Sequence, residues 1–170
     1  RLLKLRDDIL FTHKKGGKLI FIGNGASASL ASHAATDFTK QAKIKAIAFN
    51  DHNLITALAN DYGYDKWIAT ALDFYANDGD VLVLISVSGE SPSVIEAAQI
   101  AKETGLKVVT FSGRSPENSL KALGDVNFWC SFWKDLTEVL SLYFAMFLII
   151  SYALFSSGYV WILFQVCVDL

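Results

Sequence analysis

Hydrophobic residues along the chain form short continuous runs that alternate with segments of helical periodicity. In those segments apolar residues recur every three or four positions, as on one face of a helix. The runs of strand length show no in–out alternation, so both faces of their sheet are expected to be covered. Strands are predicted over residues 18–22, 44–49, 80–87, 106–111 and 126–129. Helices are predicted before Gly16 and Gly17, over residues 27–38, 52–59, 67–76 and 91–104, and from Lys134 onward.

Strands that alternate with helices predict parallel βαβ units with helices on both faces of the sheet. A chain of 170 residues suits one domain with an adequate core. We therefore expect a single domain over residues 1–170, an α/β three-layer sandwich (α/β/α) with a five-stranded parallel sheet. Ligands of such folds bind beyond the carboxyl ends of the strands. This rule singles out the loops after Ile22, Phe49, Ile85 and Phe111.

The C-terminal part of the chain is unusually apolar, with no Asp, Glu, Lys or Arg over residues 139–168. A charge-free run longer than about 18 residues is a candidate membrane span. Ser156, Ser157 and Gly158 interrupt it, which favours two shorter segments buried in an oligomer interface. Only 19% of the whole chain is charged, which is low for a free-standing domain and points the same way. A membrane-tethered protein stays as the alternative.

Charge and cysteine content exclude some classes of partner and compartment. The formal net charge is −2 and no long basic run occurs, so broad electrostatic binding to nucleic acid is not expected. Cys130 and Cys167 lie far apart without metal-ligand spacing, and we expect both to be reduced core residues. Charged residues interrupt the first turns of the chain, unlike a secretory signal. The expected location is the cytoplasm.

Two loops rich in Gly and Ser each follow a predicted strand and open a predicted helix. Residues 23–29 read Gly-Asn-Gly-Ala-Ser-Ala-Ser, and residues 86–93 read Ser-Val-Ser-Gly-Glu-Ser-Pro-Ser. A helix N-terminus offers unpaired N–H groups and a positive dipole end, glycine allows close approach, and serine hydroxyls donate to phosphate oxygens. Pro92 suits the first helical position, with Ser91 as the cap. The alternative is that these serines are only caps and turn formers, but two such loops favour a phosphate site.

Other phosphate-binding motifs match less well. Gly23 and Gly25 begin like the dinucleotide fingerprint G-x-G-x-x-G, but Ala28 stands where the third glycine belongs. The acid at Asp51 comes later than the usual ribose-binding residue. The chain also contains no G-x-x-x-x-G-K-[ST] loop for nucleoside triphosphates. The sequence therefore favours a smaller phosphorylated ligand.

Several motifs resemble the SIS (sugar isomerase) family, and within it the phosphoheptose isomerase branch. They are residues 21–29, the segment from His33 to Asp37, and residues 46–51, 56–63, 86–91 and 107–113. The resemblance is strongest over residues 16–126, whereas residues 130–170 are atypical. It implies a flavodoxin-like sheet, a homodimer or homotetramer, and active sites completed by neighbouring subunits.

The resemblance also implies roles for individual residues. His33 and Asp37 take the acid–base positions, with Asp in place of a family Glu, and they are candidate ligands of a divalent metal such as zinc. They lie four residues apart and share one side of a helix, so a surface ion pair is the simpler interpretation of the pair taken without the family. Candidate substrate and phosphate ligands are Asn24, Gly25, Ser27, Asp51, Ser86, Ser88 and Ser91.

The last predicted helix departs from the family pattern. Thr137 stands at the position of a family Gln and Ala145 at that of a family His, and no His follows His52. The family reaction is the isomerisation of sedoheptulose 7-phosphate to D-glycero-D-manno-heptose 7-phosphate through an enediol. His33 and Asp37 favour such an enzyme. The missing His favours a non-catalytic module that senses a phosphosugar or binds a protein partner, so enzymatic activity stays open.

Overall fold

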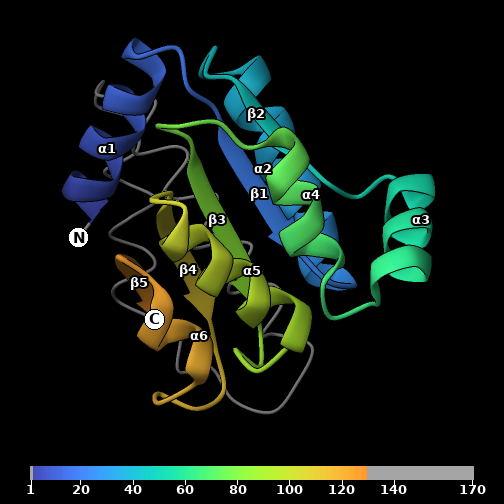
Figure 1. The fold of residues 1–170 in the computed structure, drawn as a ribbon. Coiled ribbons are helices and arrows are strands. Elements are labelled where there is room, and N and C mark those ends of the chain that lie inside the picture. The colour runs from blue at the N-terminus through green and yellow to red at the C-terminus, as the bar shows by residue number, and fades with distance from the viewer. Residues whose placement is uncertain (1, 130–170) are drawn as a thin grey trace.

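A computed structural model of the chain describes residues 2–129 and shows five parallel strands with helices on both faces (Figure 1). The strands are β1 (Leu19–Gly23), β2 (Ala46–Ala48), β3 (Val81–Ser86), β4 (Lys107–Ser112) and β5 (Val126–Trp129). The helices are α1 (Leu2–Lys14), α2 (Ala26–Lys40), α3 (His52–Tyr62), α4 (Trp67–Tyr75), α5 (Pro92–Glu103) and α6 (Ser119–Leu123). The sheet order is β2-β1-β3-β4-β5, which is the flavodoxin-like order. The predicted fold class is confirmed.

Side chains of the central strands point alternately into two separate cores. Leu19 and Phe21 of β1 pack in the core that contains residues of α1 and α2. Ile20 and Ile22 of the same strand pack in the core that contains residues of α4 and α5. Both faces are therefore covered, and this explains why the strands have no in–out alternation in the sequence.

Two details of the predicted elements are corrected by the structure. The strand expected over residues 44–49 pairs only over Ala46–Ala48, because Ile44 N–H bonds back to the Phe38 carbonyl at the end of α2 (3.1 Å). The short helix α6 was not predicted, since a five-residue segment is too brief to show helical periodicity. The other boundaries agree within a few residues.

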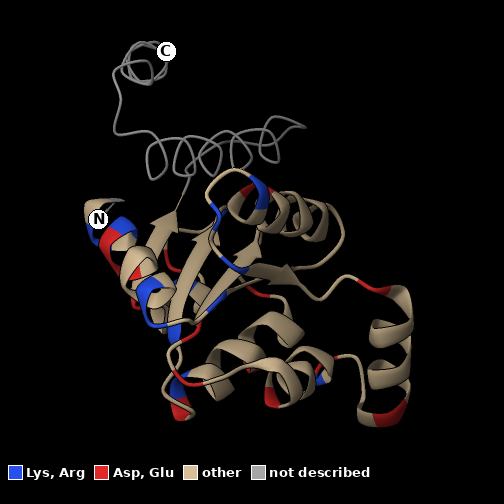
Figure 2. Ribbon diagram, turned by 90° about the horizontal axis from the view of Figure 1, so that it is seen from above, with Lys and Arg blue, Asp and Glu red and all other residues tan. Residues whose placement is uncertain are grey.

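Charged positions are dispersed over the described part of the chain. Figure 2 shows Lys and Arg interspersed with Asp and Glu along the ribbon. Within residues 2–129 no helix is long and apolar enough to cross a bilayer. The predicted helix from Lys134 and the charge-free run over residues 139–168 lie outside the described residues.

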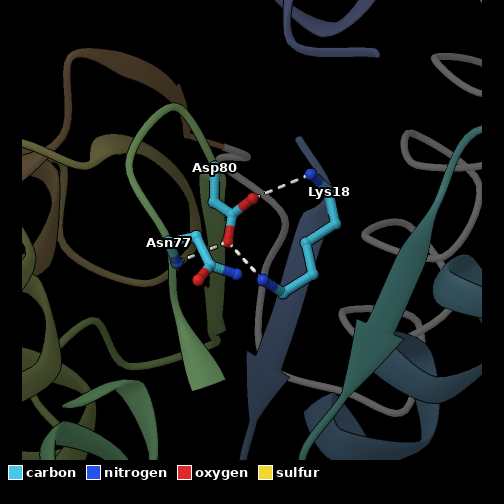
Figure 3. Close-up of polar contacts among 3 residues, drawn as sticks. All are labelled: Lys18, Asn77 and Asp80. Carbon is cyan, nitrogen blue, oxygen red and sulfur yellow. Dashed lines mark hydrogen bonds and ion pairs between the residues drawn. The ribbon is translucent and has the colours of Figure 1, made fainter. Parts of the chain in front are cut away.

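A buried carboxylate joins the starts of β1 and β3 (Figure 3). Asp80, only 2% exposed, accepts hydrogen bonds from the backbone N–H groups of Lys18 and Asn77, each at 2.8 Å. The Lys18 ammonium lies 2.5 Å from Asp80 Oδ2, the oxygen that also accepts from Asn77 N–H. Val81 N–H bonds to the Lys18 carbonyl at the same place (3.0 Å). These bonds fix the register in which Leu19 lies beside Val81.

We expect Asp80→Ala to lower the free energy of unfolding by about 3 kcal/mol, because it leaves an ammonium group and two backbone donors without their acceptor. Asp78→Ala, an exposed change in the same turn, is the control and should stay within about 0.5 kcal/mol of the wild type. Urea denaturation measures both. Equal losses in the two variants would show that Asp80 does not anchor the strands.

Candidate functional site

The sheet order places two loops side by side at one edge of the sheet. The chain leaves β1 through α2 toward β2 on one side, and it returns across β1 to form β3 on the other. The carboxyl ends of β1 and β3 therefore flank the topological switch point, where ligands of such folds bind. Gly23 at the end of β1 lies beside Ile85 near the end of β3. The loops that follow are the two Gly- and Ser-rich loops predicted to hold phosphate.

The first loop is a tight turn into α2. Gly25 is the N-cap residue, with a positive φ of 57° and no side-chain cap. Ser27 N–H bonds to the Asn24 carbonyl (3.1 Å), which closes the turn. A Cβ on Gly23 would stand 2.7 Å from the backbone of the nearly buried Ser27. Only glycine allows this close approach, so the loop geometry explains the pattern Gly-Asn-Gly.

The second loop, residues 86–93, folds the hydroxyls of Ser86 and Ser88 onto its own backbone. Ser86 Oγ accepts from Gly89 N–H (3.2 Å), and Ser88 Oγ accepts from Glu90 N–H (3.1 Å). The Ser88 hydroxyl, which accepts in this way, keeps its own hydrogen to donate to an anion. Ser91 is the N-cap residue of α5, as predicted, but its side chain makes no capping bond. Its hydroxyl lies 3.5 Å from that of Ser86. The hydroxyls of Ser86, Ser88 and Ser91 thus belong to one short loop.

The Asn24 carboxamide connects the first loop to two other elements. Its Nδ2 donates to Ser93 Oγ in the first turn of α5 (3.0 Å), and Ser93 is 1% exposed. Its Oδ1 accepts from the Tyr64 hydroxyl in the loop between α3 and α4 (3.3 Å). The predicted substrate ligand Asn24 therefore also positions the site. Tyr64 was missed in the sequence, where nothing marks a contact between residues 40 positions apart.

Two residues after β2 have local structural roles. Asp51 caps α3 by accepting from Leu54 N–H (3.0 Å), and its contact with substrate stays a prediction. Asn50 Nδ2 donates to the Ala28 carbonyl (2.5 Å) and to Ser32 Oγ (2.6 Å) on α2. The loop after β2 is thus tied to the helix that begins at the first loop.

His33 and Asp37 share one side of α2, as the spacing predicted. His33 Nε2 lies 3.2 Å from Asp37 Oδ2, with the His33 side chain 55% exposed and that of Asp37 19%. They lie about 10 and 16 Å along the helix from its start at Ala26. The pair therefore lies about two to three turns into α2 and not at its N-terminus.

The pair by itself is an incomplete metal site. Imidazole nitrogen and carboxylate oxygen are suitable zinc ligands, but structural and catalytic zinc sites use three or four protein ligands. Among residues 2–129, no three His, Cys, Asp or Glu side chains gather to hold a metal ion. A metal at His33 and Asp37 would need ligands beyond this part of the chain, and the metal stays a prediction.

The fold and the paired loops define a doubly wound α/β domain with a candidate anion site at its switch point. The chain belongs to the SIS domain family, whose sequence profile matches residues 1–113. This confirms the resemblance described above at the level of the family.

Several similar proteins are phosphoheptose isomerases. That of Thermodesulfovibrio yellowstonii is 40% identical over 109 residues, which are 61% of this chain and 54% of the relative. That of Cytophaga hutchinsonii is 38% identical over 130 residues, 74% of this chain and 68% of the relative. The structure of the Neisseria gonorrhoeae enzyme has a TM-score of 0.82 and 28% identity, covering 89% of this chain and 84% of that chain. The chain thus spans between half and about two thirds of these two curated relatives.

We expect Gly23→Ala to destabilise the protein by about 1–3 kcal/mol and also to weaken phosphate binding, because the new methyl group displaces the backbone of Ser27. Gly105→Ala is the control, since Gly105 has a φ of 77° and precedes β4, at the opposite edge of the sheet. It should cost about 1 kcal/mol of stability through backbone strain and leave phosphate affinity unchanged. Thermal unfolding and calorimetric titration measure the two effects. Equal phosphate affinity in both variants would contradict the role of the first loop.

Proposed function

We propose that the chain binds a phosphosugar at the two serine loops and interconverts its ketose and aldose forms. The observation that carries the proposal is the adjacency of the loops, which the bond between Asn24 and Ser93 documents directly (3.0 Å). Two helices, α2 and α5, begin at this edge and direct their dipoles toward the same ligand. Neither loop contains Lys or Arg, so hydroxyl and backbone donors supply the recognition.

The proposed substrate is sedoheptulose 7-phosphate, as in the phosphoheptose isomerases to which the chain is similar. Its phosphate would bind at Ser86, Ser88 and Ser91, and its carbon chain would extend toward α2. A carboxylate takes a proton from C1 of the ketose while a proton is supplied to O2, which gives the enediol. Return of a proton to C2, with loss of the O1 proton, completes the aldose. Asp37 is the proposed base, and His33 beside it is the proposed partner in proton transfer.

A phosphosugar-sensing module without catalysis is the second candidate. Ala145 stands where the resemblance places a His, and alanine cannot transfer a proton. Both candidates use the same phosphate site, so binding alone does not separate them. Turnover does, and assembly into dimers or tetramers stays a prediction of the resemblance.

Substitution of Ser88 and Ser91 by Ala should weaken binding of sedoheptulose 7-phosphate by about 1–3 kcal/mol for each lost bond to the phosphate. Both residues are half-buried and belong to the second loop. Isothermal titration calorimetry gives the affinity. Thr104→Ala, which removes an exposed hydroxyl at the opposite end of α5, is the matched control and should bind like the wild type. Unchanged affinity in the double variant would remove the phosphate site from these loops.

Isomerase activity should be weak and should depend on Asp37. The Asp side chain is one methylene shorter than the family Glu, and a misplacement of about 1 Å can cost roughly 100-fold in rate. Loss of the family His removes acid–base help of about 100- to 10,000-fold, although the two losses need not multiply. We therefore expect Asp37→Asn to abolish turnover of sedoheptulose 7-phosphate, and Ala145→His to raise it.

The control for Asp37→Asn is Asp73→Asn, which removes the charge of an exposed carboxylate on α4. A coupled assay of the aldose product measures all four proteins. Robust wild-type turnover that survives Asp37→Asn would refute the assignment of the base. Phosphosugar binding without turnover in any of them would favour the sensing module.

A further inference from the structure

The second phosphate loop is held from outside by the segment that follows β4. Gly113 N–H donates to the Val87 carbonyl, and Leu120 N–H donates to the Gly89 carbonyl, each at 3.0 Å. Residues more than 25 positions away therefore bond to the backbone of the loop. The conformation of the loop depends on where this segment lies.

Asn118 fills the space beside Gly89. Asn118 is 2% exposed, and its side chain occupies the place that a Cβ on Gly89 would need. Its Nδ2 donates to Ser112 Oγ (3.0 Å) and to the Ser115 carbonyl (2.7 Å), and its Oδ1 accepts from Lys121 N–H (3.0 Å). These three bonds, to the end of β4 and to the segment after it, fix the position of the Asn118 side chain beside the loop.

Glu90 attaches the exposed side of the loop to the same segment. Its carboxylate accepts from the backbone N–H of Ser119 (2.8 Å) and from the Ser119 hydroxyl (2.7 Å). The backbone bond, and then the hydroxyl bond, lower the pKa of the Glu90 carboxyl, so this group is ionised at neutral pH. A negative charge in a phosphate loop would by itself repel the ligand.

We propose that Glu90 and Ser119 form a clasp that positions the phosphate loop, so that Glu90 strengthens phosphate binding despite its charge. This inference rests on the proposed function of the loop. The clasp restrains Glu90, which lies two residues after Ser88. It also restrains the adjacent residue Gly89, and the Gly89 N–H bonds to Ser86 Oγ (3.2 Å). A loop restrained before binding loses less conformational entropy when the ligand arrives.

The charge effect and the clasp predict opposite signs, and this makes the proposal testable. Loss of an exposed, screened carboxylate alone should improve phosphate affinity by no more than about twofold. Loss of the clasp should weaken it by about fivefold or more. Glu90→Ala removes both the charge and the clasp, so the sign of its effect shows which dominates.

The experiment titrates the full chain with inorganic phosphate by calorimetry at fixed ionic strength. We expect Glu90→Ala to weaken binding about fivefold. Ser119→Ala removes the hydroxyl bond and keeps the backbone bond, so it should weaken binding less, and the double variant should be no weaker than Glu90→Ala. Glu90→Gln, which keeps an acceptor for Ser119 N–H, should restore part of the affinity. Glu103→Ala removes an equal charge at the far end of α5 and should not weaken binding. Phosphate binding to Glu90→Ala that equals or exceeds the wild type would overturn the proposal.

Amide hydrogen exchange separates failure of the clasp from failure of the proposed function. Absence of phosphate binding in the wild type would refute the phosphate site but not the clasp. In that case Leu120 N–H, which bonds to the Gly89 carbonyl, should exchange faster in Glu90→Ala than in Glu103→Ala. Equal exchange rates at this amide would overturn the clasp.

Discussion

The parallel pairing of β1 with β3 is the interaction on which the candidate site depends. Asp80 fixes this pairing at the amino ends of the strands through Lys18 and its backbone N–H. The same register places Gly23 beside Ile85 at the carboxyl ends. The two serine loops lie next to each other there, and among the residues that the structure describes no ion pair joins them. The stabilising ion pair and the ligand chemistry therefore lie at opposite edges of one sheet.

The candidate site relies on oriented dipoles and hydroxyl groups and not on formal positive charge. Gly25 and Ser91 begin long helices without side-chain caps, so the N–H groups of those first turns have no capping side chain to satisfy them. The backbone around these donors must be fixed, because a hydrogen bond to the ligand weakens steeply when the donor does not point at the acceptor. The bonds of Asn24 to Ser93 and Tyr64, and those around Gly89, provide that restraint.

The sequence predicts the parts of the structure that depend on local periodicity. The five strands are apolar runs, and the contact of His33 with Asp37 follows from helical spacing alone. The extent of β2 was not predictable, because it is set by the return of Ile44 to the end of α2. The contacts of Tyr64 with Asn24 and of Glu90 with Ser119 join residues 40 and 29 positions apart. Polar pairs at such separations leave no period in a sequence, so they emerge only from the fold.

The bond between Lys18 and Asp80 also has a consequence for the order in which the chain folds during synthesis. These residues are 62 positions apart, so β1 must wait for its neighbour β3 while α2, β2, α3 and α4 are translated. Until then one edge of β1 has no partner, and an apolar strand with an open edge tends to pair with other chains. Slow synthesis, or a pause before residue 81, would prolong that exposure. A nascent chain that carries β1 without β3 therefore exposes a strand edge that the finished domain covers.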